Sequence, residues 1–417
     1  MNSSESAWSS WRSALLHRAV LVASLGYFVD VYDLVLFSIV RVASLRSLGV
    51  AEDQLLTVGV QLLNMQMIGM LIGGVLWGVL GDRHGRISVL FGSIALYSLA
   101  NIANAFATTT EMYAVLRLLA GIGLAGELGA AVTLVSETLP RETRGYGTSF
   151  VAGFGVSGAI VAAAVAANFD WRASYVVGGV MGLLLLLLRL RMAESGMFSS
   201  LSTKTGISKG NFFQLFTQKE RFWRYLRCIL IGMPTWFVIG ILVTFSPEIC
   251  AELGATGKIT AGTSILFNYA GLIVGDLASG LLSQWWRSRR KVVAVFVTLT
   301  MAGCAAYLLL HGRSPAVYYG VFFILGCSAG YWALFVTIAA EQFGTNLRAT
   351  VATTAPNFIR GSVVLLTMAL TWLRGSFGLT GGAMIVGAGC FALTFAALWR
   401  LPETFGKDLD FVEGAAE

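Results

Sequence analysis

Charged side chains interrupt several long apolar stretches of this sequence, and they are the residues best suited to chemistry. Asp30 and Asp33 lie in one such stretch, and Arg117 lies in another. Two carboxylates three residues apart share one face of a helix, where they can take up and release a proton. A guanidinium offers a forked pair of donors that fits a carboxylate. These residues predict either proton coupling that involves an aspartate and Arg117, or a static ion pair that holds two helices together.

Further charges occupy later apolar stretches. Glu127 follows Arg117 by ten residues, which is about 15 Å along a helix, so the two cannot form a direct pair. Glu127 is therefore predicted as an alternative proton carrier. Arg360 and Asp276 lie at comparable depths in two other stretches. We expect Arg360 to hold the carboxylate of an anionic substrate, and the alternative is a structural pair between Arg360 and Asp276.

Aromatic and amide side chains near these charges could line a cavity. Each of them is individually more often a packing residue than a ligand, so the set is a hypothesis about the wall of a binding site. In addition to Arg360, the predicted substrate-binding residues are Tyr32, Trp236, Asn268, Tyr269, Trp332 and Asn357. Pro234 shortly precedes Trp236 and predicts a bend at this wall.

The composition indicates that these charges lie inside a membrane. Of the 417 residues, 56% are hydrophobic and only 12% are charged, whereas a soluble domain has about 25% charged residues. Apolar runs of about 20 residues, the length that crosses a bilayer, recur along the chain. We count twelve such runs, so the predicted fold is an all-α polytopic membrane protein. A charge at the bilayer centre costs at least about 2.5 kcal/mol, which argues that these residues serve a purpose.

Basic residues are distributed unevenly between the two sides of the predicted spans. If the N-terminus is cytoplasmic, 20 of the 29 Lys and Arg residues fall on the cytoplasmic side and 6 on the external side. This asymmetry follows the positive-inside rule, so the net charge of +7 reflects topology rather than nucleic-acid binding. The predicted location is the inner (cytoplasmic) membrane, with multiple spans and both termini cytoplasmic.

The predicted spans form two sets of six around one long polar connection. Glu137 and Arg144 recur 204 residues later as Glu341 and Arg348, and this internal repeat supports the division. We expect these four residues to form salt bridges that change during a conformational cycle. The predicted segments are a cytoplasmic N-terminus at 1–18, a six-helix bundle at 19–192, a cytoplasmic linker at 193–222, a second six-helix bundle at 223–401 and a cytoplasmic C-terminus at 402–417.

The loop after the second predicted span reads GVLGDRHGRI and contains Gly78, Asp82, Arg83, Gly85 and Arg86. Gly85 permits a tight turn with positive φ, and Asp82 can cap a helix or pair with an arginine. This G-x-x-x-D-R-x-G-R pattern, together with the spans and their division, resembles the major facilitator superfamily. The resemblance covers essentially the whole chain. It implies two pseudo-symmetric six-helix bundles around a central cavity, with the loop clamping neighbouring helices in one state of a transport cycle.

The stretch RLLAGIGLAGE contains Gly121, Gly123 and Gly126 in a G-x-G-x-x-G arrangement. No predicted strand precedes it, so a dinucleotide-binding interpretation lacks its structural context. The stretch instead resembles the R-x-x-x-G-x-G-x-x-x-E pattern of symporters in this superfamily, with Arg117 and Glu127 at its ends. Glycines at these positions would let a neighbouring helix pack closely.

Finer resemblances point to proton symporters within the superfamily. Asp30–Asp33 reads DVYD and resembles the D-G-F-D signature of the aromatic-acid:proton symporters, with Val31 where that signature has glycine. Arg348–Gly361 resembles a second segment of that family, whereas AGELG and RMAES resemble the metabolite:proton symporters. The resemblance implies import of a small organic solute, an organic anion, with a proton by alternating access. It leaves the identity of the solute open.

The alternative function is proton-antiport export of a drug or metabolite. Exporters of the superfamily usually carry a proline in a glycine-rich fifth span, and this sequence has Ser157 there, within AGFGVSGAIVA. An enzyme is not expected, because the cysteines and histidines are scattered and no catalytic or metal-binding constellation is evident. The predicted partners are a small-molecule substrate and the lipid bilayer, without nucleic acid. No cofactor is predicted beyond the proton gradient, and a monomer is expected.

Overall fold

The computed structural model describes residues 18–84, 86–127, 129, 150–151, 153–194, 212–406 and 413, and every regular element in them is helical. In this part of the chain, eight helices are long and apolar enough to cross a membrane. One of them, Thr350–Trp399, contains a reversal, and two shorter apolar helices, Val89–Asn104 and Gly153–Asn168, accompany the eight. The fold is therefore all-α and of the membrane-spanning type, while the count of twelve spans stays a prediction.

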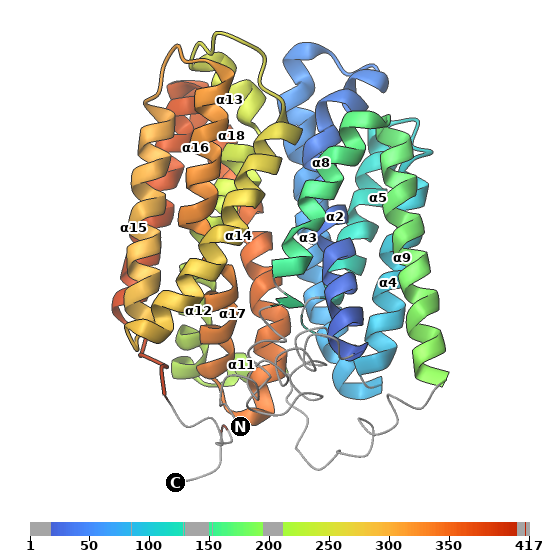
Figure 1. Cartoon of the computed structure of the whole chain (residues 1–417), viewed down its shortest axis with the longest axis vertical. Coiled ribbons are helices and arrows are strands. Elements are labelled where there is room, and N and C mark those ends of the chain that lie inside the picture. The colour runs from blue at the N-terminus through green and yellow to red at the C-terminus, as the bar shows by residue number, and fades with distance from the viewer. Residues whose placement is uncertain are drawn as a thin grey trace, which may run out of the picture.

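The first half of the chain forms one side of the molecule, on the right in Figure 1. Most of its helices run along the long axis of the molecule and pack side by side. In chain order its elements are α2 (Arg18–Ser47), the short η1 (Glu52–Gln54), α3 (Leu55–His84), α4 (Arg86–Asn104), α5 (Thr110–Leu124), α8 (Gly158–Asn168) and α9 (Trp171–Glu194).

The glycines of RLLAGIGLAGE are packing residues in this half. A Cβ on Gly121 of α5 would lie 2.1 Å from the carbonyl oxygen of Gln66 on α3. A Cβ on Gly123 would lie 2.6 Å from the backbone nitrogen of Tyr97 on α4. Neither position has room for a side chain, so these glycines let α5 approach two neighbouring helices closely.

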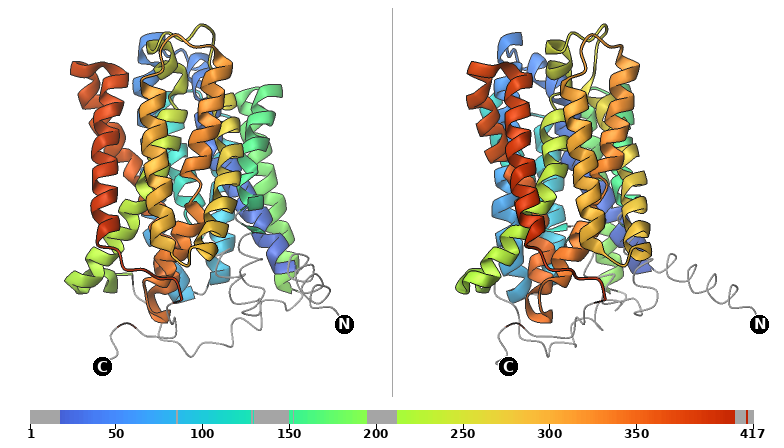
Figure 2. Two further views of the ribbon diagram at one scale, coloured as in Figure 1. Left: turned by 60° about the vertical axis from the view of Figure 1, so that its left-hand side comes forward. Right: turned by 90° about the vertical axis from the view of Figure 1, so that its left-hand side faces the viewer.

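The second half lies on the left in Figure 1, and Figure 2 shows the last helical segment on its flank. In chain order its elements are α11 (Gln214–Thr217), α12 (Lys219–Phe237), the π-helical η2 (Val238–Val243), α13 (Ser246–Glu252), α14 (Ala261–Trp285), α15 (Arg289–Leu308), α16 (Pro315–Ala329), α17 (Trp332–Glu341) and α18 (Thr345–Trp399). We call the end of the molecule with α13 the α13 face and the opposite end, with α11, the α11 face.

α18 contains two antiparallel segments joined by a sharp reversal at Gly378. Its φ of +71° lies in the left-handed region that favours glycine. The next two N–H groups, those of Leu379 and Thr380, donate to the carboxylate of Glu252 on α13 at 3.0 Å each. Glu252 therefore caps the second segment, which returns toward the α11 face (Figure 2).

Two spans of the second half are interrupted inside the molecule. α12 contains Pro234 and continues into η2, where the Thr244 N–H donates to the carbonyl of Ile239 at 3.2 Å. α16 ends at Ala329, and α17 begins at Trp332. In a membrane protein, irregular backbone is tolerated where it is buried in protein or lines a cavity, and π-helical turns are frequent at functional sites. Both interruptions therefore direct attention to the centre of the fold.

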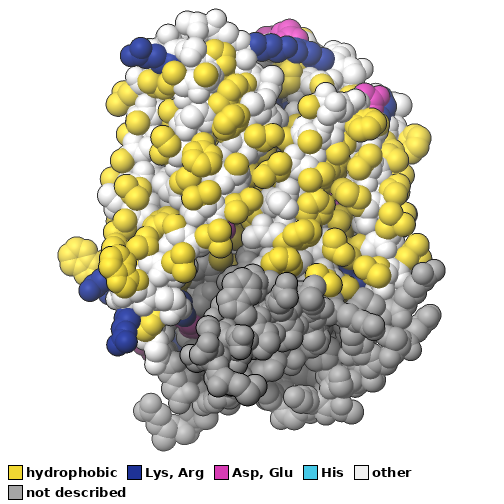
Figure 3. All heavy atoms as spheres, viewed as in Figure 1, with side chains coloured by type: hydrophobic (Ala, Val, Ile, Leu, Met, Phe, Trp, Pro, Cys, Tyr) yellow, Lys and Arg dark blue, Asp and Glu magenta, His cyan; other side chains and the backbone are white. Residues whose placement is uncertain are grey.

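Apolar side chains cover the flank of the molecule in Figure 3, and charged side chains gather toward its two ends. Leu281, Trp285 and Trp372 are between 73% and 80% exposed. Large apolar residues left open over a whole flank are not stable in water, but they match the hydrocarbon interior of a bilayer. The surface therefore agrees with a multi-pass membrane protein.

Candidate functional site

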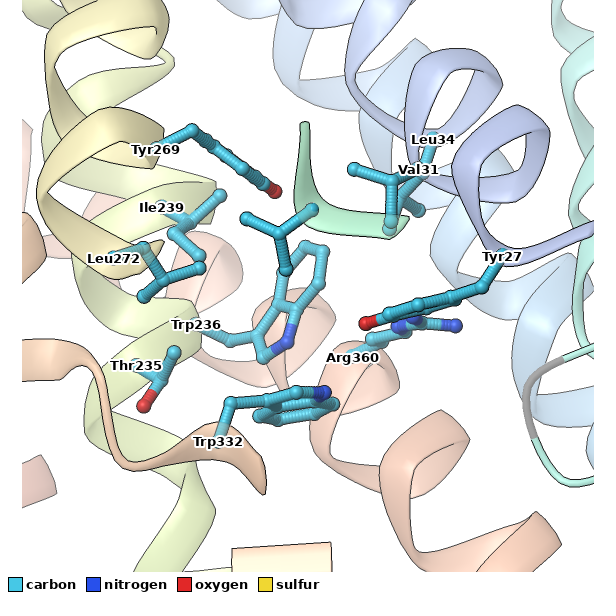
Figure 4. Close-up of a pocket in the computed structure, with 11 residues that line it drawn as sticks. Tyr27, Val31, Leu34, Thr235, Trp236, Ile239, Tyr269, Leu272, Trp332 and Arg360 are labelled. Carbon is cyan, nitrogen blue, oxygen red and sulfur yellow. The ribbon is translucent and has the colours of Figure 1, made fainter. Parts of the chain in front are cut away.

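A pocket lies between the two halves, with about 330 Å³ of empty space that is partly open. It is lined by Tyr27, Val31 and Leu34 of α2, by Val156, by Thr235 and Trp236 of α12, by Ile239 of η2, by Tyr269 and Leu272 of α14, by Trp332 of α17 and by Arg360 of α18. In Figure 4, Tyr27 reaches in from one side and Tyr269 from the other. The wall is thus mainly aromatic and aliphatic, and it carries one guanidinium.

Arg360 is the charged residue of this wall, and it is 1% exposed. Its guanidinium carbon lies 5.8 Å from the ring centre of Trp236 and 5.9 Å from that of Trp332. Its Nη2 lies 3.7 Å from Oδ2 of Asp30, on α2 in the other half. A buried charge is costly unless it is paired, so the aspartate and the two indoles compensate the charge of Arg360. Arg360 therefore connects the pocket wall to an ion pair that spans the interface between the halves.

The sequence analysis offered Asp276 as an alternative partner for Arg360, because the two lie at comparable depths in their spans. Asp276 does not pair with Arg360; its Oδ1 accepts a hydrogen bond from the Ala333 N–H at 3.1 Å instead. Depth along a span can be read from the sequence, but the identity of the facing helix cannot. Here α2 supplies the carboxylate for Arg360. The alternative of a structural pair between Asp276 and Arg360 is therefore replaced by the pair between Asp30 and Arg360.

Asp33 and Arg117 form a second polar site, inside the first half. Both residues have no exposed surface, and the charge of Arg117 acts on the Asp33 carboxylate. Arg117 Nη1 donates to the Tyr175 hydroxyl at 3.3 Å, and its guanidinium carbon lies 5.5 Å from the ring centre of Phe37. Asp33 lies against Gly178 of α9, where a Cβ would be 2.2 Å from Oδ1. Asp30 and Asp33 thus serve two different sites, although they are three residues apart.

Glu127 forms a buried ion pair with Arg189 of α9, a residue that the sequence analysis did not single out. Arg189 Nη2 lies 2.5 Å from Oε1 of Glu127, and Nη1 donates to Oε2 at 3.0 Å. Gly26 of α2 makes room for the pair, because a Cβ there would lie 2.1 Å from Oε1. The only signal for Arg189 was an arginine near the end of the apolar run LLLLLLRLR. α9 extends beyond this arginine, which explains why it is buried.

Some predicted wall residues line the pocket and others do not. Trp236, Tyr269 and Trp332 line it together with Arg360, and so does Tyr27, which was not predicted. Tyr27 has the helical spacing of an ordinary packing residue, so its sequence position offered little signal.

Tyr32, Asn268 and Asn357 lie outside the lining. The Tyr32 hydroxyl donates to a backbone carbonyl of α9 at 3.0 Å, and Asn268 Nδ2 donates to one of α16 at 3.1 Å. Asn357 Oδ1 accepts a hydrogen bond from Arg360 at 3.5 Å. Tyr32 and Asn268 therefore connect helices, whereas Asn357 touches the pocket through Arg360.

Arg41 and Glu248 join the halves at the α13 face. Arg41 is fully buried, and its Nη2 lies 2.5 Å from Oε1 of Glu248. Its guanidinium carbon lies 4.8 Å from the ring centre of Phe245, and beside it the hydroxyls of Ser38 and Thr244 are 3.1 Å apart. Arg41 lies inside α2, which continues to Ser47, and the sequence analysis did not single it out. This pair is a second charge contact across the interface.

The residues predicted to change partners at the α11 face are described only in part. Gly78 lies in α3, where a Cβ would be 3.7 Å from Thr354 of α18. Glu341 pairs with Arg289 of α15 at 2.7 Å, and Arg348 lies near the start of α18. Outside the described side chains lie Asp82, Arg83, Gly85, Arg86, Glu137 and Arg144.

In the described part of the chain, no group of His, Cys, Asp and Glu residues could hold a metal ion.

Comparison with known proteins identifies the family. The sequence profile of the Major Facilitator Superfamily matches residues 23–355. The chain belongs to this superfamily. The sialic acid transporter NanX of Escherichia coli (strain K12) is 25% identical to it over 391 residues, which are 91% of this chain and 93% of the relative. The 4-hydroxybenzoate transporter PcaK of Pseudomonas putida is 25% identical over 369 residues, 80% of each chain.

A solved structure has the same architecture as this chain. The proton:xylose symporter XylE, bound to 6-bromo-6-deoxy-D-glucose, matches with a TM-score of 0.70 at 18% identity. The match covers 94% of this chain and 97% of that chain. The expected major facilitator fold is thus confirmed. The protein is a multi-pass membrane transporter of small organic solutes, not an enzyme.

Proposed function

We propose that this transporter imports a small organic anion, a carboxylate with a planar or aromatic body, by proton symport. The observation that carries the proposal is the ion pair between Asp30 and Arg360 at an aromatic pocket between the halves. The Arg360 guanidinium can bind a carboxylate in a forked manner, while Trp236 and Trp332 offer faces to a ring.

Asp30 and the carboxylate of a solute compete for one guanidinium in this mechanism. When the solute binds Arg360, Asp30 loses its ionic partner in a buried place, where an unpaired charge is costly. A proton on Asp30 removes that cost, so solute and proton favour each other's binding. The coupling is reciprocal, because each ligand changes the affinity for the other by the same factor. Asp30 is the group we assign to proton coupling, with Asp33 and Glu127 as the alternatives.

Alternating access follows from the contacts between the halves. In the proposed orientation, the α11 face is cytoplasmic, the α13 face is external, and the protein is a monomer in the inner membrane with both termini cytoplasmic. Opening toward the outside breaks the pair between Arg41 and Glu248, which joins the halves there. Release to the inside follows when the halves rock about the central pocket, as in other transporters built from two repeats.

Two relatives support the choice of a carboxylate. Sialic acid and 4-hydroxybenzoate, the solutes in their names, are both carboxylic acids. Both solutes carry a carboxylate, and a guanidinium that faces the pocket is the group suited to bind it. The aromatic wall favours the second type, in which the carboxylate is attached to an aromatic ring.

Transport by the purified protein in sealed proteoliposomes tests the proposal. With 4-hydroxybenzoate as the probe and an imposed acid-outside gradient, the wild type is expected to accumulate the probe above equilibrium. Asp30→Asn is expected to bind the probe but to lose gradient-driven accumulation. Glu52→Gln, an exposed carboxylate on the same half, is the matched control and should transport as the wild type does. Accumulation that ignores the gradient in the wild type, or persists in Asp30→Asn, would contradict the proposed coupling.

A further inference from the structure

One wall of the pocket depends on a helix that begins inside the molecule. α16 ends at Ala329, the chain turns through Gly330 and Tyr331, and α17 begins at Trp332. Trp332 lines the pocket, with its ring centre 5.9 Å from the guanidinium carbon of Arg360. Whatever fixes the start of α17 therefore also fixes this indole.

Close packing of α14 against α16 brings a carboxylate to this break. A Cβ on Gly330 would lie 2.5 Å from the Cα of Gly275 on α14. One turn earlier, a Cβ on Gly326 would lie 1.9 Å from the carbonyl oxygen of Asn268. Only glycines allow backbones to approach in this way. The residue that follows Gly275 is Asp276, which is half-buried beside the break.

Asp276 binds a backbone N–H group at the buried start of α17. The first N–H groups of a helix have no partner within it, and together they form the positive end of its dipole. Asp276 Oδ1 accepts the N–H of Ala333, the second residue of α17, at 3.1 Å. A carboxylate is a strong acceptor for such a group, and its charge also suits the dipole. The hydrogen bond therefore anchors α17 to α14.

The other side of the break is held by α12. The Tyr331 hydroxyl donates to the carbonyl of Ile231 at 3.0 Å, and the Thr235 hydroxyl donates to that of Ala329 at 3.3 Å. These bonds fix the end of α16 and the turn. Asp276 is thus the side chain that bonds a backbone N–H within the first turn of α17.

We propose that Asp276 is a positioning residue for the solute site, which holds the start of α17 and thereby the Trp332 indole against the pocket. It acts on the affinity for aromatic carboxylates and on their preference over aliphatic ones. The proposal rests on the proposed function, because it treats the pocket as the solute site. It assigns Asp276 no part in proton coupling.

Binding to the purified full-length protein tests the effect on selectivity. Asp276→Ala is expected to weaken the binding of 4-hydroxybenzoate about tenfold, through the loss of one charge-assisted hydrogen bond, and that of the aliphatic hexanoate by less than about twofold. Asp276→Asn keeps an oxygen acceptor at the same place and should restore most of the affinity. Ser283→Ala, two turns further along α14, is the control and should bind both probes as the wild type does, since its hydroxyl donates to the carbonyl of Gly280 and not to Asp276. Equal losses for both probes, or no rescue by asparagine, would overturn the proposal.

A double-mutant cycle separates an action through Trp332 from a direct one. Trp332→Leu alone should weaken 4-hydroxybenzoate binding. If Asp276 acts through the indole, adding Asp276→Ala to Trp332→Leu causes little further loss, because the two residues then belong to one interaction. Losses that simply add would show that Asp276 does not work through Trp332.

Two further measurements keep the proposal testable if a variant fails. The difference in fluorescence between the wild type and Trp332→Phe isolates the emission of Trp332 among the 11 tryptophans. Asp276→Ala should shift this emission without any ligand, and an unchanged emission would overturn the positioning role. If the wild type bound no carboxylate, the proposed function would fail, but a shift of the ligand-free Trp332 emission in Asp276→Ala would still support the positioning role. If Asp276→Ala does not fold, Asp276→Glu displaces the carboxylate by one methylene and should weaken aromatic binding, so wild-type affinity there would also overturn the proposal.

Discussion

The interior of the first half and the interface between the halves treat buried charge differently. Inside the first half, Glu127 pairs with Arg189 of the same half. At the interface, the pocket guanidinium of Arg360 takes its carboxylate from Asp30 of the other half. A pair within one half moves as part of one rigid body, whereas a pair across the interface must change when the halves move. The comparison therefore separates charges that stabilise the fold from charges that take part in the cycle.

The contact at the α13 face belongs to the second kind. Arg41 and Glu248 come from different halves, and Arg41 is fully buried. If the distinction holds, loss of a pair within one half lowers stability, and loss of a pair across the interface changes binding or transport.

The largest effect is expected for the pair inside the first half. Glu127→Gln leaves Arg189 buried without its carboxylate, which should lower the free energy of unfolding by about 3–5 kcal/mol. Denaturant or thermal unfolding in detergent measures this loss. The double variant Glu127→Gln, Arg189→Met should recover much of the stability. If Glu127→Gln kept normal stability but lost proton coupling, Glu127 would instead be a proton carrier, as the sequence analysis considered.

The next effect is expected for the pocket guanidinium. Arg360→Ala removes the forked donors and should weaken binding of 4-hydroxybenzoate by about 100-fold, or about 2.7 kcal/mol. Arg360→Lys keeps the charge without the forked donors, so its affinity should lie between that of the wild type and that of Arg360→Ala. Calorimetry on the purified protein measures both affinities. A wild-type affinity in Arg360→Ala would remove this residue from the solute site.

A smaller effect is expected for Asp33. The arginine whose charge acts on Asp33 lies in the same half, so Asp33→Asn should lower gradient-driven accumulation by only about threefold, equivalent to about 0.6 kcal/mol, while Asp30→Asn abolishes it. Uptake into proteoliposomes at several external pH values compares the two variants. The reverse ranking would assign the proton to Asp33 and break the comparison between the halves.

No measurable effect is expected for the exposed pair of Arg46 and Glu52. Their side chains are 49% and 69% exposed, and water screens such pairs strongly. Glu52→Gln should therefore leave both the melting temperature and transport unchanged. A clear loss of stability or transport would contradict the assumption that an exposed pair contributes little.

The sequence predicts the fold and the depth of its charges well. Composition and span length are sufficient for an all-α membrane protein, and the loop containing Gly78 points to the superfamily. The pocket lining contains Trp236, Tyr269, Trp332 and Arg360, which were predicted as a buried arginine and aromatic side chains that could surround it. These properties depend on position along one helix, which the sequence specifies directly.

The pairing of charges is not predictable in the same way. Asp30 meets Arg360 across the interface, and Asp276 meets the start of α17. These contacts depend on the rotation of each helix and on which helix faces it, and similar depths fit several partners. Arg41 and Arg189 were missed for the same reason, because each lies near the end of its span and its partner is on another helix.

The π-helical turn η2 links the pocket to the α13 face by a fixed count of residues. Such a turn contains one residue more than the corresponding α-helical turn. Since each residue of an α-helix rotates the chain by about 100°, deleting one residue from Val238–Val243 would swing Glu248 away from Arg41 while Trp236 stayed in place. Chain length in this segment is therefore a functional variable of its own, and a one-residue deletion would test it where no substitution can.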